Sequence, residues 1–360
     1  MQTADILIIG GGMAGISAGA MMAAEAKVHV LEAEPMTGYH STGRSAAIFI
    51  RNYGNATLRA LNALSVDFFE TPEGVSDRSL LTPRGELLLA REDELDVLRD
   101  YADGAEGLEH LTPSEAADLV PILRDGVFAA AILERDAQDI DVDRMLQGYT
   151  RLLKARGGVV TCGARVETMR RAGGVWVVET PAGAFQAPVV VNAAGAWAGA
   201  VAALAGAQAI PVTPCRRSAA LLPAPAEGVM DWPLFGSVSE TWYAKPDAGR
   251  LMVSPADADP VEPHDAWPDD MVLAEGLDRY ERSVTLPVTR VERSWAGLRS
   301  FAPDKTPVVG FDRQAEGLLW LAGQGGYGIQ TAPALAQIAC ALVTGQEAGE
   351  VAQALSPTRF

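Results

Sequence analysis

The chain has 360 residues, of which 48% are hydrophobic and 21% are charged, and its 29 basic and 46 acidic side chains give a formal net charge of −17. This length suggests about two domains, with a core large enough to need no disulfide or structural metal. The negative charge excludes sequence-independent binding to nucleic acid or to an anionic membrane surface, because both require clustered cations.

The first residues, MQTADILIIGG, contain no basic segment followed by a long apolar run, so no signal peptide is predicted. Apolar runs elsewhere are interrupted well before 18 residues, which predicts no membrane span. The three cysteines, Cys162, Cys215 and Cys340, form no CxxC pair and favour a reducing compartment. We therefore expect a soluble, cytoplasmic protein.

Residues 5–32 have the pattern of a dinucleotide-binding unit. A short buried strand, DILII at 5–9, is followed by the glycine motif GGGMAG at 10–15, a small-residue helix at 16–26 and a second strand, KVHVL, at 27–31. Gly10 permits the tight turn, Gly12 lets the backbone approach a pyrophosphate, and Gly15 lets the helix pack on the strand. Glu32 ends the second strand, where an acid accepts ribose hydroxyls. This order of elements predicts that an adenine dinucleotide binds here.

A hydroxyl-rich segment follows, GYHSTGRSAA at 38–47. Its small residues fit beside a pyrophosphate and an isoalloxazine ring, and Arg44 and Ser45 are candidate donors to phosphate or flavin oxygens. A polar surface loop is the alternative interpretation.

The rest of the chain divides by its patterning. Amphipathic helices are expected at 58–69, 92–102 and 114–120, around a short strand, ELLLA, at 86–90. Residues 140–210 have β/α patterns, whereas 212–295 are rich in β-prone alternation up to a helix at 269–283. A small-residue helix is expected at 333–343.

Four segments together resemble the family of FAD-dependent D-amino acid dehydrogenases and glycine oxidases (the DAO family). These are GYHSTGRSAA, VVVNAAGAW at 189–197, SWAGLRSF at 294–301 and AGQGGYGIQT at 322–331. Within the family, the first and last segments resemble those of bacterial D-arginine dehydrogenases. The resemblance implies FAD as cofactor, bound by Gly10, Gly12, Met13, Ala14, Gly15, Glu32, Ala33, Ser41, Thr42, Arg44, Ser45, Ala46, Val166, Ala194, Gly195, Trp197, Arg299, Gly325, Gly326, Tyr327, Gly328, Ile329 and Gln330.

The expected fold is α/β with two domains: a Rossmann-like FAD-binding domain of the glutathione reductase type, and a substrate domain built on a mixed β-sheet. Because the closing glycine turn lies far from Gly10 in the sequence, the FAD-binding domain must be assembled from separated segments. We assign 1–54, 140–211 and 296–360 to it, and 55–139 and 212–295 to the substrate-binding domain. The active site is expected between the two domains.

Arginine is the natural clamp for a substrate carboxylate, because its planar fork donates two parallel hydrogen bonds. Arg299 lies in an apolar segment, and the resemblance implies that it is this clamp, with a structural ion pair as the alternative. Arg216 and Arg217 would point to opposite faces of a strand, so only one can enter the pocket. Matching by segment selects Arg216. The resemblance also implies that the Tyr243 hydroxyl donates to the same carboxylate and that Tyr53 forms a lid over the substrate. It further implies that backbone groups around Gly326 accept from the substrate amine.

Glu86 is the residue most informative about substrate side chains. The resemblance implies that its carboxylate meets a cationic side chain, while a solvated strand-end acid is the alternative. However, Ile48 and Ile50 stand where the D-arginine dehydrogenase pattern has a histidine and a threonine. This apolar wall favours bulky or apolar D-amino acids.

The expected function is FAD-dependent oxidation of D-amino acids to 2-oxo acids and ammonia, with hydride transfer from Cα to flavin N5. The electron acceptor, quinone or O2, stays open. Alternatives are a glycine- or sarcosine-type amine oxidase on the same fold and a non-catalytic flavin-binding subunit. The four histidines have no metal-ligand spacing, so no metal site is expected. A serine hydrolase is not expected either.

Overall fold

A six-stranded sheet, built from strands that are far apart in the sequence, forms the centre of one half of the molecule. The computed structural model describes residues 1–224 and 227–360. Five strands of this sheet are parallel and the last pairs antiparallel with its neighbour. Their order across the sheet is β10 (Val159–Thr161), β3 (Val28–Leu31), β2 (Ile6–Ile9), β14 (Val189–Asn192), β21 (Leu318–Ala322) and β20 (Val308–Phe311).

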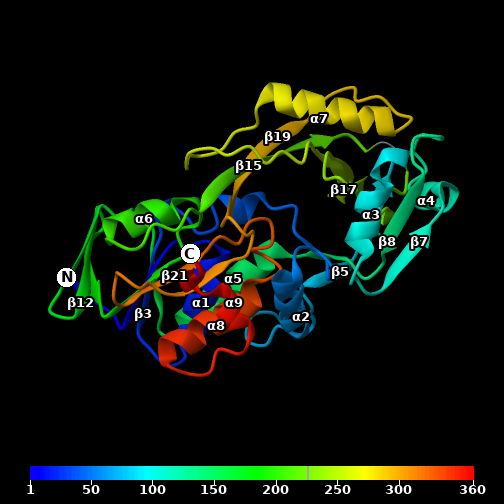
Figure 1. The fold of residues 1–360 in the computed structure, drawn as a ribbon. Coiled ribbons are helices and arrows are strands. Elements are labelled where there is room, and N and C mark those ends of the chain that lie inside the picture. The colour runs from blue at the N-terminus through cyan, green and yellow to red at the C-terminus, as the bar shows by residue number, and fades with distance from the viewer. Residues whose placement is uncertain (225–226) are drawn as a thin grey trace.

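The two faces of this sheet are covered by different structures (Figure 1). Ile6 and Ile8 face the helices, whereas Leu7 and Ile9, one residue out of step, face the opposite layer. The helical layer contains α1 (Met13–Met22), α2 (Ala56–Glu70), α5 (Val142–Ala155), α8 (Ala332–Thr344) and α9 (Val351–Leu355). The opposite layer contains α6 (Ala198–Leu204) and a four-stranded sheet of β1 (Gln2–Thr3), β13 (Gly183–Ala187), β12 (Val175–Thr180) and β11 (Thr168–Ala172).

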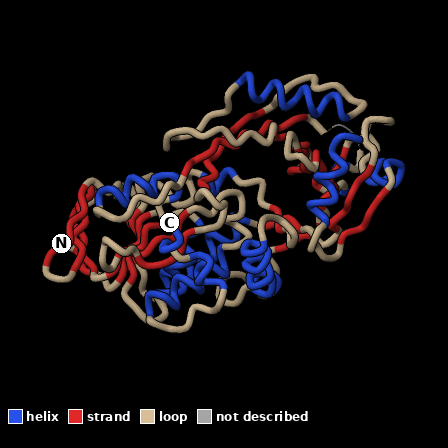
Figure 2. Tube along the Cα trace, in the orientation of Figure 1, coloured by secondary structure: helices blue, strands red, loops and turns tan. Residues whose placement is uncertain are grey.

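An eight-stranded mixed sheet organises the other half (Figure 2). Its order is β19 (Arg293–Phe301), β15 (Thr213–Leu222), β18 (Arg250–Ser254), β17 (Tyr243–Asp247), β16 (Leu234–Ser237), β6 (Glu86–Ala90), β8 (Ala130–Glu134) and β7 (Leu108–Leu111). Leu87 and Leu89 pack into a core with α4 (Pro113–Leu119) and α7 (Asp270–Ser283). Leu88, on the other face, packs towards α3 (Leu95–Ala102). A three-stranded sheet of β4 (Ile48–Phe49), β9 (Gln138–Ile140) and β5 (Leu81–Pro83) completes the fold.

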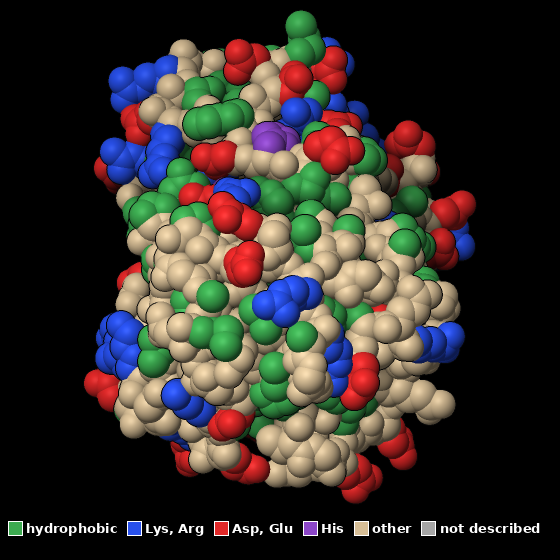
Figure 3. Space-filling view, turned by 90° about the vertical axis from the view of Figure 1, so that its left-hand side faces the viewer, with side chains coloured by type: hydrophobic (Ala, Val, Ile, Leu, Met, Phe, Trp, Pro, Cys, Tyr) green, Lys and Arg blue, Asp and Glu red, His purple; other side chains and the backbone are tan. Residues whose placement is uncertain are grey.

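The surface is mixed in character on the face shown in Figure 3, where acidic, basic and hydrophobic side chains are interspersed. Among the described residues, no helix combines the length and the hydropathy that crossing a bilayer would need.

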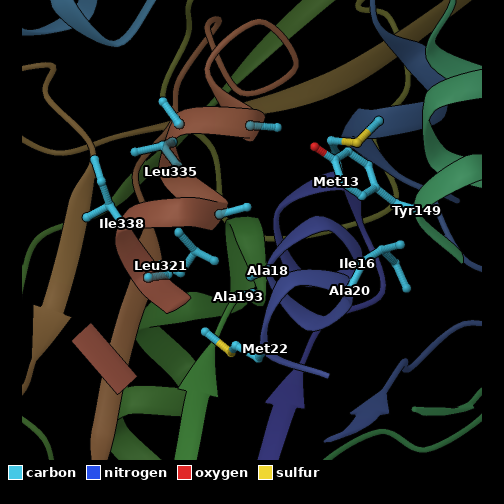
Figure 4. Close-up of a cluster of buried hydrophobic side chains, with 14 of the residues drawn as sticks. Met13, Ile16, Ala18, Ala20, Met22, Tyr149, Ala193, Leu321, Leu335 and Ile338 are labelled. Atoms are coloured by element: carbon cyan, nitrogen blue, oxygen red, sulfur yellow. The ribbon is translucent and has the colours of Figure 1, made fainter. Parts of the chain in front are cut away.

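The core beneath the glycine motif combines large apolar side chains with alanines that let helices approach closely (Figure 4). Helix α1 packs against both α5 and α8. Ala18 and Ala20 are completely buried, and Met22 fills the space near its end. A Cβ at Gly15 would lie 1.9 Å from the carbonyl oxygen of Gly10, so this helix meets the preceding turn only because position 15 is glycine.

The expected fold class is confirmed, and most expected elements are present. The strand at 86–90 is β6, the helix at 269–283 is α7, and the helix at 333–343 is α8, extended by one residue at each end. The first helix ends earlier than expected, at Met22, and the chain then turns into β3. The division into domains stays a proposal, with one adjustment: β19 crosses the expected boundary at residue 295 and pairs along its length with β15.

Candidate active site

The larger of two adjoining cavities, about 340 Å³, lies between the two main sheets and is lined by the segments that the sequence singles out. Its volume is in the range of small-molecule sites. The residues expected to bind cofactor that line it are Gly10, Gly12, Met13, Ala14, Glu32, Ala33, Ser41, Thr42, Arg44, Ser45, Ala46, Val166, Ala194, Gly195, Trp197, Arg299, Gly325, Gly326, Gly328 and Ile329. Gly15, Tyr327 and Gln330 lie outside this lining.

The glycine motif leaves room for a phosphate group at the start of α1. Gly12 is the N-cap of this helix, and a Cβ there would meet only the Thr42 hydroxyl, at 3.3 Å. Gly12, Met13 and Ala14 line the cavity, so the helix N-terminus faces it, and no acidic residue in the first turn offsets its partial positive charge. This arrangement suits the pyrophosphate of a dinucleotide.

Glu32 is held in place by two backbone N–H groups. Its carboxylate accepts from Gly11 at 2.6 Å and from Glu34 at 2.8 Å, and the residue is 8% exposed. Since a carboxylate has four lone-pair positions, it keeps the capacity to accept from ribose hydroxyls at the cavity wall. The glycine motif and Glu32 together fit the adenosine diphosphate half of FAD.

Replacing Gly12 with valine is expected to weaken FAD binding at least about tenfold without unfolding the protein, because the side chain would occupy pyrophosphate space. Flavin content after purification and a titration of the apoprotein with FAD measure this effect. Gly15→Val is the comparison, and we expect it to lower the unfolding temperature because of the 1.9 Å contact. A G12V protein that binds FAD normally would show that the pyrophosphate lies elsewhere.

Arg44 has a different environment from the one expected. Its guanidinium donates to the carbonyl oxygens of Ala266 and Ala296, each at 3.0 Å, and forms an ion pair with Asp265. Its donors therefore hold protein segments together, and the interpretation of Arg44 as a phosphate or flavin donor is not supported by these contacts. Ser41 likewise donates to the Leu298 carbonyl at 2.6 Å, so the 38–47 segment is tied to β19.

The smaller cavity, about 110 Å³, adjoins the larger one and shares part of its lining. Its walls include Tyr53, Glu86, Ile48 and Ile50. The residues that line both cavities, and so mark their junction, are Ser45, Ala46, Arg217, Tyr243, Arg299, Gly326 and Ile329. A substrate at this junction would contact the cofactor on one side and the smaller cavity on the other.

The selection of Arg216 over Arg217 is wrong. Residues 213–222 do form a strand, but Arg217 lines both cavities, whereas Arg216 forms ion pairs with Asp257 and Asp259 outside them. The pairing of β15 with β19 gives the reason. Arg217 is opposite Gly297, so it lies diagonally from Arg299 on one face of the sheet, while Arg216 faces the other way.

The junction is strongly cationic. Within residues 1–224 and 227–360, neither Arg217 nor Arg299 has an acidic partner within ion-pair distance, and Arg217 donates to the Asp257 carbonyl, at 2.7 Å. The Arg217 guanidinium lies 6.0 Å from the centre of the Tyr243 ring. Burial alone would raise the pKa of the Tyr243 hydroxyl, but the charges of Arg299 and Arg217 outweigh it and lower this pKa. Two such guanidinium groups can bind a carboxylate.

Tyr53 lies on the segment 50–53, whose backbone is fixed by hydrogen bonds from buried polar side chains. The sequence did not predict these hydrogen bonds. The Asn62 amide donates to the carbonyls of Ile50, Arg51 and Tyr53, each at 3.2 Å. Glu134 accepts from the Arg51 backbone at 2.7 Å. Gln330, expected at the cofactor, instead bonds Asn62 and the Ile50 backbone. The ring of Tyr327 lies against Tyr53, with centroids 4.8 Å apart.

Glu86 is buried in the wall of the smaller cavity, with 7% exposure, and accepts a hydrogen bond from the Tyr101 hydroxyl at 3.2 Å. In the antiparallel pairing of β6 with β8, Glu86 lies opposite Glu134. Burial, together with the charge of Glu134, raises the pKa of Glu86 to about 8. The solvated strand-end alternative is therefore wrong. Glu240, which the sequence did not single out, also lines this cavity.

Comparison with known proteins agrees with this site. Residues 5–342 match the model of the family DAO, FAD dependent oxidoreductase. The protein is thus an FAD-dependent oxidoreductase, and FAD is its cofactor. The chain belongs to the DAO family.

Curated relatives match at low identity. The FAD-dependent oxidoreductase domain-containing protein 1 of Bos taurus is 25% identical over 95% of this chain and 81% of its own length. Hydrogen cyanide synthase subunit HcnC of Pseudomonas aeruginosa is 29% identical over 42% of this chain and 35% of its own. The 4-methylaminobutanoate oxidase of Paenarthrobacter nicotinovorans is 26% identical over 98% of this chain. This chain spans only 45% of that relative's length.

Solved structures match along nearly the whole chain. The glycine oxidase of Geobacillus kaustophilus superposes with a TM-score of 0.87 at 23% identity, covering 100% of both chains. The L-proline dehydrogenase of P. horikoshii gives 0.84 at 21% identity, covering 100% of this chain and 98% of its own. At this identity, the likeness establishes the shared fold.

Proposed function

We propose that this protein oxidises α-amino acids at the carbon that bears the nitrogen, with D-amino acids as the preferred substrates. The observation that carries the proposal is the pair of guanidinium groups, Arg217 and Arg299, at the junction of the two cavities. FAD, when bound, supplies the acceptor for the hydride that leaves Cα. An amino acid bound with a neutral amine thereby becomes an iminium, and water then converts the iminium into a 2-oxo acid and ammonium.

The protein's task in this reaction is to bind and orient the substrate. Arg217 and Arg299 bind the substrate carboxylate, and the Tyr243 hydroxyl donates to it. The backbone at Gly326 passes close beneath Arg299, since a Cβ there would lie 3.0 Å from a guanidinium nitrogen. The resemblance to the DAO family supports the Gly326 carbonyl as an acceptor for the substrate amine. Fixing the two groups attached to Cα directs its hydrogen towards the cofactor.

The smaller cavity sets the preference for the side chain. Ile48 and Ile50 give it an apolar wall. With a pKa near 8, Glu86 is mostly protonated at neutral pH and does not attract a cation strongly. We therefore propose bulky or apolar D-amino acids as substrates at neutral pH, with D-arginine favoured only at higher pH. We also propose that, within the family, the protein is most similar to the D-arginine dehydrogenases.

A second candidate is the oxidation of glycine or secondary amines. The volume of the smaller cavity, about 110 Å³, favours small substrates. The names of several relatives also support it, since they include a 4-methylaminobutanoate oxidase, the sarcosine dehydrogenase of Homo sapiens and a glycine oxidase.

Anaerobic mixing of the FAD-bound protein with a panel of compounds tests both candidates. The panel contains D- and L-leucine, D- and L-arginine, glycine and sarcosine, and loss of flavin absorbance reports hydride transfer. We expect the D-enantiomers to bleach the flavin fastest. Bleaching only by sarcosine or glycine would support the second candidate, whereas bleaching only by L-enantiomers would overturn the preference for D. No bleaching by any compound would favour a non-catalytic flavin-binding subunit.

The electron acceptor is tested with the same substrates. Peroxide formation in air identifies an oxidase. Turnover that requires a quinone or a dye identifies a dehydrogenase.

A further inference from the structure

The turn at residues 254–259 wraps around β15 at the position where Arg217 enters the active site. The Ser254 hydroxyl donates to the Ser218 carbonyl at 2.6 Å, and the Arg216 backbone N–H donates to the Asp259 carbonyl at 2.9 Å. Ala256 has a φ of +55°, a left-handed conformation that costs free energy for a residue with a Cβ. The chain thus keeps a strained turn in contact with the strand that carries the active-site arginine.

Asp257, at the centre of this turn, contacts three consecutive residues of β15. Its carboxylate accepts from the Ser218 backbone at 2.6 Å, from the Ser218 hydroxyl at 2.8 Å and from the Arg216 guanidinium at 3.4 Å. Its carbonyl accepts from Arg217 at 2.7 Å. The side chain of Asp257 is only 2% exposed, so its negative charge requires a partner inside the protein.

Two arginines are close enough to be that partner, and the structure assigns the carboxylate to only one of them. Arg216 pairs with Asp257 and also with Asp259, on the face of β15 away from the cavities. Arg217 donates to the neutral carbonyl of Asp257 and not to its carboxylate. The positive charge of Arg217 is therefore left for a group in the cavity.

We propose that Arg216 and Asp257 form a positioning pair, which holds Arg217 in place through the Asp257 carbonyl and keeps the Asp257 carboxylate from neutralising it. Neither side chain lines the cavities. The inference rests on the proposed function, in which Arg217 binds a substrate carboxylate. Without Arg216, the buried carboxylate would lose its cation and pair with Arg217, and substrate binding would weaken.

The test measures the dissociation constant of pyruvate, a small 2-oxo acid, from the change in flavin absorbance of the FAD-bound protein. Arg217→Ala is expected to weaken pyruvate binding at least about tenfold. Arg216→Leu is expected to weaken it by a similar factor, about tenfold, although Arg216 does not line the cavity.

The distinctive result is rescue by a second substitution. An asparagine at 257 has a side-chain oxygen that can accept from the Ser218 N–H and an NH2 group that can donate to the Ser218 hydroxyl. Unlike the aspartate, it carries no charge. The Arg216→Leu/Asp257→Asn double variant is therefore expected to bind pyruvate within about twofold of the unsubstituted protein. Asp259→Asn is the control, because Asp259 is the exposed partner of Arg216, and it should leave binding unchanged.

The role of Arg217 and the role of the positioning pair are tested separately. Normal pyruvate binding by R217A would overturn the role of Arg217 in the proposed function. If R217A weakens binding but R216L does not, or if D257N does not rescue R216L, the positioning pair is overturned. Should R216L fail to retain FAD, R216Q replaces it, since its amide still donates to Asp257. The expected loss is then about threefold, with the same rescue.

Discussion

Replacing Arg299 with alanine is expected to raise the KM for the amino acid substrate about 100-fold while FAD remains bound. The side chain lines both cavities and has no acidic partner within ion-pair distance among the described residues, so we propose that the substrate carboxylate compensates its charge. Loss of a charged, bidentate partner costs roughly 3 kcal/mol, which corresponds to about two orders of magnitude in binding. Steady-state kinetics together with the flavin-to-protein ratio measure both parts of the prediction.

Two further variants sharpen this result. Arg299→Lys keeps the charge but loses the planar fork, so its KM should lie between that of the unsubstituted protein and that of R299A. Arg293→Ala removes an exposed arginine at the start of the same strand and should leave KM unchanged. If R299A shows unchanged kinetics, Arg299 has a structural role instead.

Glu86→Gln is expected to abolish a pH-dependent change in substrate preference centred near pH 8. Below this pH the Glu86 carboxyl is mostly neutral, and above it the carboxylate attracts a cationic side chain. The ratio of kcat/KM for D-arginine to that for D-leucine should therefore rise through pH 8 in the unsubstituted protein and stay flat in E86Q. Taking the ratio cancels the titration of the α-amine, which both substrates share.

Glu86→Leu complements this measurement at high pH. At pH 9 it should reduce activity with D-arginine much more than activity with D-leucine. An equal effect on the two substrates would reject contact between Glu86 and the side chain.

The same carboxyl should also make stability depend on pH. Its pKa is raised from 4.5 in the unfolded chain to about 8 in the folded protein, so the folded state holds this proton more tightly. The stabilisation is complete below pH 4.5 and is lost as the pH rises through 8, by at most about 5 kcal/mol. Chemical denaturation at pH 6 and pH 9 should show a smaller loss of unfolding free energy in E86Q. An identical loss in both proteins would contradict the raised pKa.

The cofactor half of the site could be predicted from the sequence because its determinants are local. Gly10, Gly12, Gly15 and Glu32 act through a turn, a helix start and a strand end that follow one another within one βαβ unit. Their spacing therefore identifies both the ligand and the elements. The expected order of strand, helix, strand and acid is present in the structure.

The substrate half was less predictable because it depends on pairing between distant strands. Successive side chains of β15 point to opposite faces of the sheet, so a shift of one residue decides whether Arg216 or Arg217 faces the cavity. The register between β15 and β19 then places Arg217 next to Arg299. The sequence around the two arginines does not reveal this register. Asn62 and Glu134 were missed for a related reason, since their partners are backbone groups of residues 50–53.

The position of β21 in the six-stranded sheet has a consequence for biosynthesis. Residues 318–322 insert between β14 and β20, and the turn at 325–329 that closes the cavity follows immediately. A chain emerging from the ribosome can pair β2, β3 and β14 early, but its cavity lacks a wall until residues 318–329 are made. We therefore expect FAD to be captured only after this segment is made, and shorter nascent chains to expose apolar strand edges that need protection from aggregation.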